Sequence, residues 1–286
     1  MTNKPIPHRS STPRVAINWM VNCVATLAAA AGIFFLGWIL WVVVQRGIAA
    51  INWSFFVELP APPGMPGGGV ANALVGTLLM TLIGTALGVP VGVLSGIYLA
   101  EFGRYGRFGA MVRFGVNLVM GIPSIIVGLF VYTVMVKPVG HFSGYAGAVS
   151  LAIIMLPVVA RTTEDMLLLV PNALRESALA LGAPRWKVTL GVVFRAARTG
   201  LITGMLLSVA RISGETAPLL FTALNSNFWP SSLGQPTANL TVTIFNYAMS
   251  PFADWQQIAW GASLLIMAAV LLLNIAARWG TARRVR

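Results

Sequence analysis

The sequence predicts an all-α polytopic membrane protein with six transmembrane helices. Its 286 residues are 57% hydrophobic and only 9% charged, and the mean hydropathy is +0.81. A soluble domain has about 25% charged residues. A chain this apolar would need more interior than its length can supply, so lipid is expected to surround much of it. This composition excludes most soluble enzymes.

Six apolar segments predict the transmembrane helices, because each can cross much or all of a hydrocarbon layer about 30 Å thick at a rise of about 1.5 Å per residue. The first segment is longer than the apolar region of a signal peptide, about 7–15 residues, so we expect an uncleaved span. The fourth is short and is expected to end at Pro157. The segments are Trp19–Val44, Ala71–Ala100, Phe114–Val136, Tyr145–Ala160, Thr199–Leu224 and Ile258–Ala277.

The positive charges are unevenly distributed between the connections. Sixteen of the nineteen Lys and Arg residues fall in the two terminal segments and in the loops after the second and fourth spans. Only Arg46 and Lys137 fall in the other loops, and Arg211 lies inside the fifth span. The positive-inside rule therefore places both termini in the cytoplasm. We read the net charge of +12 as a determinant of topology and not as a nucleic-acid-binding face.

The predicted organisation is one transmembrane domain over residues 19–280, with a cytoplasmic loop at about 161–198. Short cytoplasmic tails are expected at residues 1–18 and 281–286. The outer loop at 225–257 contains no Lys or Arg, and it can hold a short re-entrant or surface helix around Leu240–Ala248.

The sequence lacks the residue patterns that several kinds of chemistry require. A Walker A loop needs a lysine preceded by glycine, and none of the three lysines follows one. The chain has a single cysteine and two histidines, so a disulfide within the chain is excluded and a metal site is not expected. We therefore predict no catalytic residues, no metal and no cofactor in this chain.

Glycines recur at every fourth position of the second span, at Gly84, Gly88, Gly92 and Gly96. This spacing puts them on one face of a helix and lets another backbone approach closely. Internal helix packing is the favoured interpretation, and a subunit or gating interface is the alternative. The segment Gly121-Ile-Pro-Ser124 predicts a kink or local unwinding in the third span.

Arg211 and Glu215 are candidate site residues because they are four residues apart, on one face of the fifth span. Counted from Thr199, Arg211 would lie about 18 Å into the apolar layer. A charge at that depth usually faces a partner or an aqueous cavity. The guanidinium suits an oxyanion, and Glu215 would partly neutralise and orient it. The alternative is a structural ion pair.

The cytoplasmic loop Arg161–Arg198 predicts a helix–turn–helix, with Gly182 and Pro184 ending the first helix. Acidic residues are interleaved with the basic ones, which favours docking of a soluble partner. A helix lying on the membrane surface is the alternative.

Residues 176–182, ESALALG, resemble the EAA loop of ABC importer permeases, Glu-Ala-Ala-x-x-x-Gly, with Ser177 at the second position. Residues 211–224, in the second half of the predicted fifth span, add to the resemblance to ABC importer permeases. From Trp38 to the last span, the sequence resembles the A-type permease subunit of phosphate-specific ABC importers. The segments that carry this resemblance are 67–74 (GGGVANAL), 123–130 (PSIIVGLF), 161–164 (RTTE) and 211–224 (RISGETAPLLFTAL).

The resemblance implies a type I ABC importer permease that takes up inorganic phosphate through a bacterial inner membrane. It implies a C-type permease partner, two ATPase subunits that bind ATP and magnesium, and an external phosphate-binding protein, with no nucleic acid. Arg211 and Glu215 would line the substrate pathway, and Glu176, Ser177, Ala178 and Gly182 would contact the ATPase. A permease for another oxyanion, such as sulfate or molybdate, an ion-coupled secondary transporter and a membrane-embedded sensor of phosphate import remain alternatives.

Overall fold

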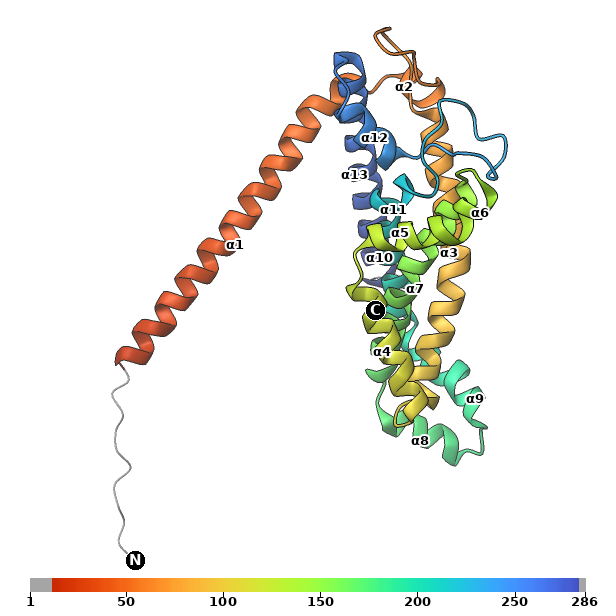
Figure 1. The fold of residues 1–286 in the computed structure, drawn as a ribbon. Coiled ribbons are helices and arrows are strands. Elements are labelled where there is room, and N and C mark those ends of the chain that lie inside the picture. Colours follow the sequence, from red (N-terminus) through yellow and green to blue (C-terminus); the bar gives the residue numbers. More distant parts are fainter. Residues whose placement is uncertain (1–11, 283–286) are drawn as a thin grey trace, which may run out of the picture. The chain divides into compact units, whose positions relative to one another are not determined.

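The computed structural model describes residues 12–282, and within this range the regular structure is entirely helical (Figure 1). The contacts divide the chain into two units, with the boundary in the sequence between Arg46 and Gly47. The predicted all-α fold is confirmed. The predicted tails lie partly outside the described residues, and the helix α1 already begins at Thr12.

The first unit contains α1 (Thr12–Gly47), a helix of 36 residues whose last residue, Gly47, already belongs to the second unit. At about 1.5 Å per residue, a helix of this length exceeds the thickness of a hydrocarbon layer. Large apolar side chains are exposed all along it, including Trp19, Phe34 and Trp38. A helix that is apolar on every side is typical of a membrane span.

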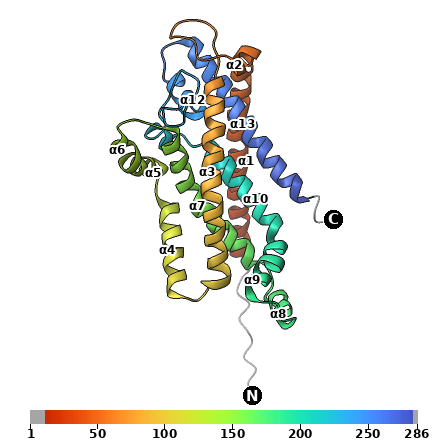
Figure 2. The ribbon, with the colours of Figure 1, turned by 90° about the vertical axis from the view of Figure 1, so that its right-hand side faces the viewer.

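The second unit is a bundle of long helices with short helices at both ends. Figures 1 and 2 show α3, α7 and α10 running along the bundle, with α8 and α9 at one end and α2 and α12 at the other. The elements are η1 (Ile48–Ala50), α2 (Trp53–Val57), α3 (Ala71–Ile97), η2 (Tyr98–Phe102), α4 (Arg107–Gly121), α5 (Ser124–Val131), η3 (Tyr132–Val136), α6 (Lys137–Val139), α7 (Gly144–Leu168), α8 (Asn172–Ala180), α9 (Arg185–Lys187), η4 (Val188–Val193), α10 (Phe194–Ser213), α11 (Ala217–Leu220), α12 (Leu240–Ala248) and α13 (Ala253–Ala282). Of the η elements, η1 is a 3₁₀-helix and the other three are π-helices.

Among the described residues, five helices are long and apolar enough to cross a membrane, and α4 with α5 forms a sixth span if the bent pair is counted as one. The six-span prediction is therefore confirmed. The predicted break in the third span is confirmed too, since α4 and α5 are bent by 102°. The backbone of Ile122 is extended (ψ 129°), as expected for a residue before proline.

Two predicted spans have different ends in the structure. The fourth does not end at Pro157, because α7 continues to Leu168. Pro157 is itself buried, and neighbouring helices can compensate for the backbone hydrogen bond that a proline removes. The fifth span is not one helix to Leu224, since α10 ends at Ser213 and a short α11 follows.

The glycine-bearing face of α3 packs against α7. A methyl group added at Gly92 would lie 2.8 Å from Cβ of Val159, and one at Gly96 would lie 2.5 Å from Cβ of Thr163. These separations are too short for a side chain, so the two backbones need glycine to pack this closely. Internal helix packing is confirmed as the role of this face, since α7 covers it. The facing pairs are Gly84 with Leu151, Gly88 with Ala152, Gly92 with Val159 and Gly96 with Thr163.

Candidate functional site

Arg211 lies in the last turn of α10, and Glu215 lies just beyond the end of this helix. Two backbone hydrogen bonds that span three residues end the helix. The amide of Gly214 donates to the carbonyl of Arg211, and the amide of Glu215 donates to the carbonyl of Ile212. The prediction that both residues share one face of a continuous helix is therefore wrong. Nε of Arg211 nevertheless lies 4.0 Å from Oε1 of Glu215.

The two side chains line a groove of about 220 Å³ beside the break between α4 and α5. The side chain of Arg211 is 58% exposed and that of Glu215 is 17% exposed. Apolar side chains of α4, α5 and α7 make up most of the remaining lining. The residues of the groove are Val119, Met120, Ile122, Pro123, Ser124, Val127, Ile154, Val158, Arg211 and Glu215.

Two contacts fix the backbone that follows Arg211. The hydroxyl of Thr241, in α12, lies 2.8 Å from the carbonyl oxygen of Glu215 and 2.9 Å from Oδ1 of Asn239. Further along, α11 packs closely on α5, where a methyl group added at Gly128 would lie 2.6 Å from Cα of Pro218. The loop that carries Glu215 is thus held from both sides.

This arrangement leaves the guanidinium of Arg211 able to bind an anion. Among the described residues, its one charged partner is Glu215, at the limiting distance of 4.0 Å. An ion pair this long and this exposed is weak. The free donors of a guanidinium form a planar fork that matches a tetrahedral oxyanion.

The connection between α7 and α10 has the predicted helix–turn–helix form, made by α8, a turn and α9. Gly182 forms the turn with φ +80°, a backbone conformation that favours glycine, and an added side chain there would meet open space. Glu176 and Ser177 are exposed and Ala178 is half-buried. Leu181, beside Gly182, is 89% exposed. The four predicted coupling residues therefore lie together on one protruding element.

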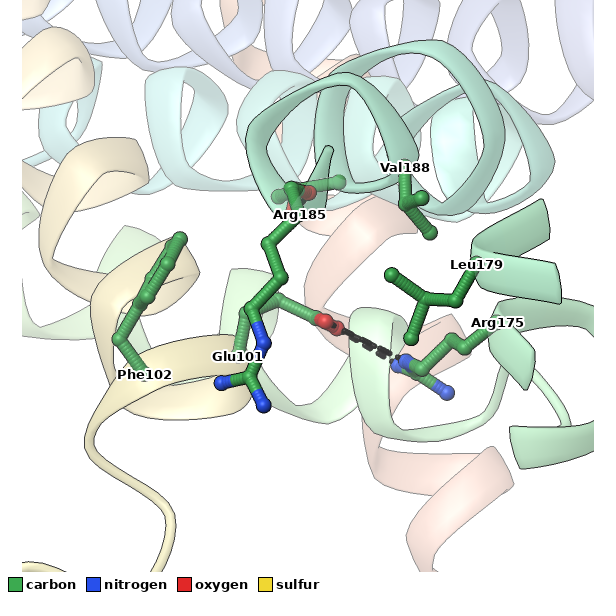
Figure 3. Close-up of a pocket in the computed structure, with 7 residues that line it drawn as sticks. Glu101, Phe102, Arg175, Leu179, Arg185 and Val188 are labelled. Carbon is green, nitrogen blue, oxygen red and sulfur yellow. Dashed lines mark hydrogen bonds and ion pairs between the residues drawn. The ribbon is translucent and has the colours of Figure 1, made fainter. Parts of the chain in front are cut away.

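Sequence reasoning missed the contacts that attach this element to the bundle. Nη2 of Arg175 lies 2.7 Å from Oε1 of Glu101, in η2, and it also donates to the carbonyl of Leu167, in α7. Figure 3 shows Glu101 and Arg175 pointing toward one another across a pocket of about 200 Å³, with Leu179 nearby. Glu101 is one of only seven acidic residues in the chain, and this scarcity is the sign in the sequence that Glu101 has a specific role.

A second ionic cluster joins α4 to α7. Glu164 is 2% exposed, and its Oε1 lies 2.5 Å from Nε of Arg113. Nη2 of Arg113 also donates to the carbonyl of Leu99 in η2, at 2.7 Å. The sequence indicated Glu164 only as one of the acids interleaved in a loop, whereas it is buried in α7.

The predicted site residues fall in two separate places, the groove at the end of α10 and the α8–α9 hairpin at one end of the bundle (Figure 1).

Comparison with known proteins decides the family. The model of the family described as "Binding-protein-dependent transport system inner membrane component" matches residues 88–285. The chain belongs to this family. It is therefore a multi-pass membrane protein and the permease subunit of an ABC-type transport system.

Individual relatives confirm the resemblance given by the motifs. The phosphate transport system permease protein PstA of Yersinia pestis is 51% identical over 247 residues, which are 86% of this chain and 84% of that protein. The PstA protein of Haemophilus influenzae is 49% identical over the same length, 86% of this chain and 87% of that protein.

Solved structures share the fold. A chain of the MetNI methionine ABC transporter, in an inward-facing conformation, aligns with a TM-score of 0.61 at 22% identity, over 76% of this chain and 95% of that chain. A chain of a bacterial alginate ABC transporter, in complex with an alginate-bound periplasmic protein, aligns with a TM-score of 0.67 at 16% identity, over 96% of this chain and 97% of that chain.

Proposed function

We propose that this chain is the A-type permease subunit of an ATP-driven importer of inorganic phosphate. The names of the PstA relatives support the substrate. The observation that carries the proposal is Arg211, whose half-exposed guanidinium lies in an otherwise mostly apolar groove. The proposed location is the bacterial inner membrane, with both termini in the cytoplasm, as the distribution of Lys and Arg indicates.

The proposed partners are a C-type permease, two ATPase subunits and an external phosphate-binding protein. The two permeases together would form the translocation pathway. The chain itself binds no nucleotide and no cofactor in this proposal, and ATP and magnesium bind to the ATPase subunits. The lack of a lysine preceded by glycine supports this division of labour.

In the groove, Arg211 donates hydrogen bonds to phosphate oxygens and Glu215 partly neutralises the guanidinium. Inorganic phosphate carries at least one proton at neutral pH, whereas sulfate carries none. A neighbouring carboxylate can accept a hydrogen bond from a protonated oxyanion but repels a fully deprotonated one. The arginine and the carboxylate together therefore favour phosphate over sulfate.

On the cytoplasmic side, the hairpin of α8 and α9 docks on an ATPase subunit. Glu176 and Ser177 present the docking surface, Ala178 packs their helix against the bundle, and Gly182 lets the turn approach closely. Dimerisation and opening of the ATPase subunits would move this hairpin and switch the groove between its outward-facing and inward-facing states.

Uptake of radiolabelled phosphate tests the proposal, in bacteria whose own gene for this subunit is deleted and replaced by this chain. We expect uptake that stops on ATP depletion, persists when the ion gradients are collapsed with ATP maintained, and resists an excess of sulfate or molybdate. Uptake that follows the ion gradient would instead indicate a secondary transporter. Competition by sulfate or molybdate would indicate a permease for another oxyanion.

A further inference from the structure

Arg175 connects the α8 helix to two other elements at once. Its Nε and Nη2 contact the carboxylate of Glu101 at 2.7–3.3 Å, in η2 at the end of α3. Its Nη1 and Nη2 also donate to the carbonyls of Val170 and Leu167, at the end of α7, at 2.5 and 2.7 Å. One side chain thus joins α8 to the ends of both helices that form the centre of the bundle.

Apart from this side chain, α8 contacts the bundle chiefly through η4. None of its nine residues is fully buried, and Ala178 is the side chain of α8 that packs against the neighbouring apolar cluster. The side chains of Arg175 and Glu101 are only 14% and 11% exposed, so their ion pair is largely removed from water. A partly desolvated pair with several hydrogen bonds is stronger than a surface pair.

The partner of Arg175 lies in a π-helix. The π-helix η2 continues α3, and a second one, η4, lies on the other side of the same pocket and continues into α10 (Figure 3). Single-turn π-helices are frequent at functional sites. The Arg175–Glu101 pair therefore holds the π-helical end of α3.

We propose that Arg175 is a positioning residue that makes α8, η2 and the end of α7 move together, so that a displacement of α8 reaches the membrane helices. The inference rests on the proposed function, in which ATPase subunits displace α8. Without the pair, α8 still docks on the ATPase and still contacts η4, but its movement no longer reaches η2 and α3. Loss of Arg175 then uncouples ATP hydrolysis from transport in the complex that assembles.

The experiment compares Arg175→Gln, Glu101→Gln and the double variant in the complete purified complex, reconstituted in vesicles. Asp165→Asn is the matched control, because it removes a carboxylate whose partner is Arg161, 3.2 Å away on the same helix. The measurements are the amount of complex, ATP hydrolysis with and without phosphate-loaded binding protein, and the phosphate imported per ATP hydrolysed.

We expect both single variants to lower the phosphate imported per ATP hydrolysed by about tenfold or more, a ratio that does not depend on how much complex assembles, since a desolvated charge pair is lost. The double variant should be no worse than Arg175→Gln alone, because residues that act as one unit are not additive. Asp165→Asn should resemble the wild type. Normal coupling in Glu101→Gln, or additive losses in the double variant, would overturn the proposal.

A second measurement does not depend on the transported substrate. Spin labels at Tyr105, which is 92% exposed in the turn after η2, and at Ala173, in α8, report the distance between the two elements. We expect a narrow distribution in the wild type, with and without ATP, and a broad one in Arg175→Gln. A narrow distribution in Arg175→Gln would refute the mechanical link, whereas a wild-type complex that imports no phosphate would refute only the proposed function.

Discussion

Replacing Arg211 by glutamine is expected to abolish phosphate uptake without reducing the amount of assembled complex. In the structure, the charge that this change removes has one weak partner. Arg211 and Glu215 are 4.0 Å apart, and the arginine side chain is 58% exposed. Exposed ion pairs contribute about 0–1 kcal/mol to stability, so the loss of this pair leaves the fold and the assembly intact.

The expected effect on transport is much larger. A hydrogen bond to a charged group contributes about 1.5–3 kcal/mol, and a guanidinium can form two such bonds with one phosphate. Losing both costs at least about 3 kcal/mol, and each 1.4 kcal/mol is about a factor of ten. Uptake per complex should therefore fall by about a hundredfold or more. Arg211→Lys keeps the charge but loses the planar fork, so we expect partial transport.

The assay is radiolabelled phosphate uptake divided by the amount of assembled complex, for Arg211→Gln, Glu215→Gln and the uncharged double variant. If the pair were structural, each single variant would reduce the amount of complex and the double variant would restore it. Full uptake in the double variant would refute a role for Arg211 in translocation. It would also remove the observation on which the phosphate pathway rests.

Three further outcomes are expected. Gly182→Trp should abolish uptake with the permease still accumulating in the membrane, because a bulky residue in the exposed, left-handed turn blocks docking; normal uptake would exclude that role. Gly96→Leu should lower the melting temperature of the purified permease, since overpacking costs about 1–3 kcal/mol. Gly115→Leu is the control and should leave the melting temperature unchanged, because a side chain there meets open space. Equal melting temperatures for the two variants would contradict the packing argument. In a cysteine-free background, a thiol at exposed Met65 should react with an impermeant reagent from outside, and one at Arg185 only from inside; labelling of Arg185 from outside would reverse the topology.

The spans could be predicted because the membrane imposes a local pattern on the sequence. Apolar length and charge distribution need no knowledge of neighbouring helices. The break before Ser124 was predictable for the same reason, since Pro123 acts on the residue next to it. The bounds of α12 coincide with the predicted Leu240–Ala248, where Asn239 caps the helix through the amide of Val242.

The failures of prediction involve contacts between distant parts of the chain. Pro157 does not end α7, because the surrounding helices bury it and hold the helix together. The depth predicted for Arg211 assumed one helix from Thr199, whereas this span begins at Arg185 and ends at Ser213. Arg175 and Glu101 are 74 residues apart, and no local pattern reports such a pair. Residue types thus indicated the groove, but only packing reveals the attachment of α8.

The helix α7 connects the two parts of the candidate site. Its end at Leu167 accepts a hydrogen bond from Arg175, and its Val158 lines the groove of Arg211. These two positions are nine residues apart, about 14 Å along a helix at 1.5 Å per residue. The close packing of α3 on α7 at Gly92 and Gly96 prevents the two helices from sliding independently. A displacement of α8 would therefore reach the wall of the groove through one rigid pair of helices, without a relay of flexible side chains.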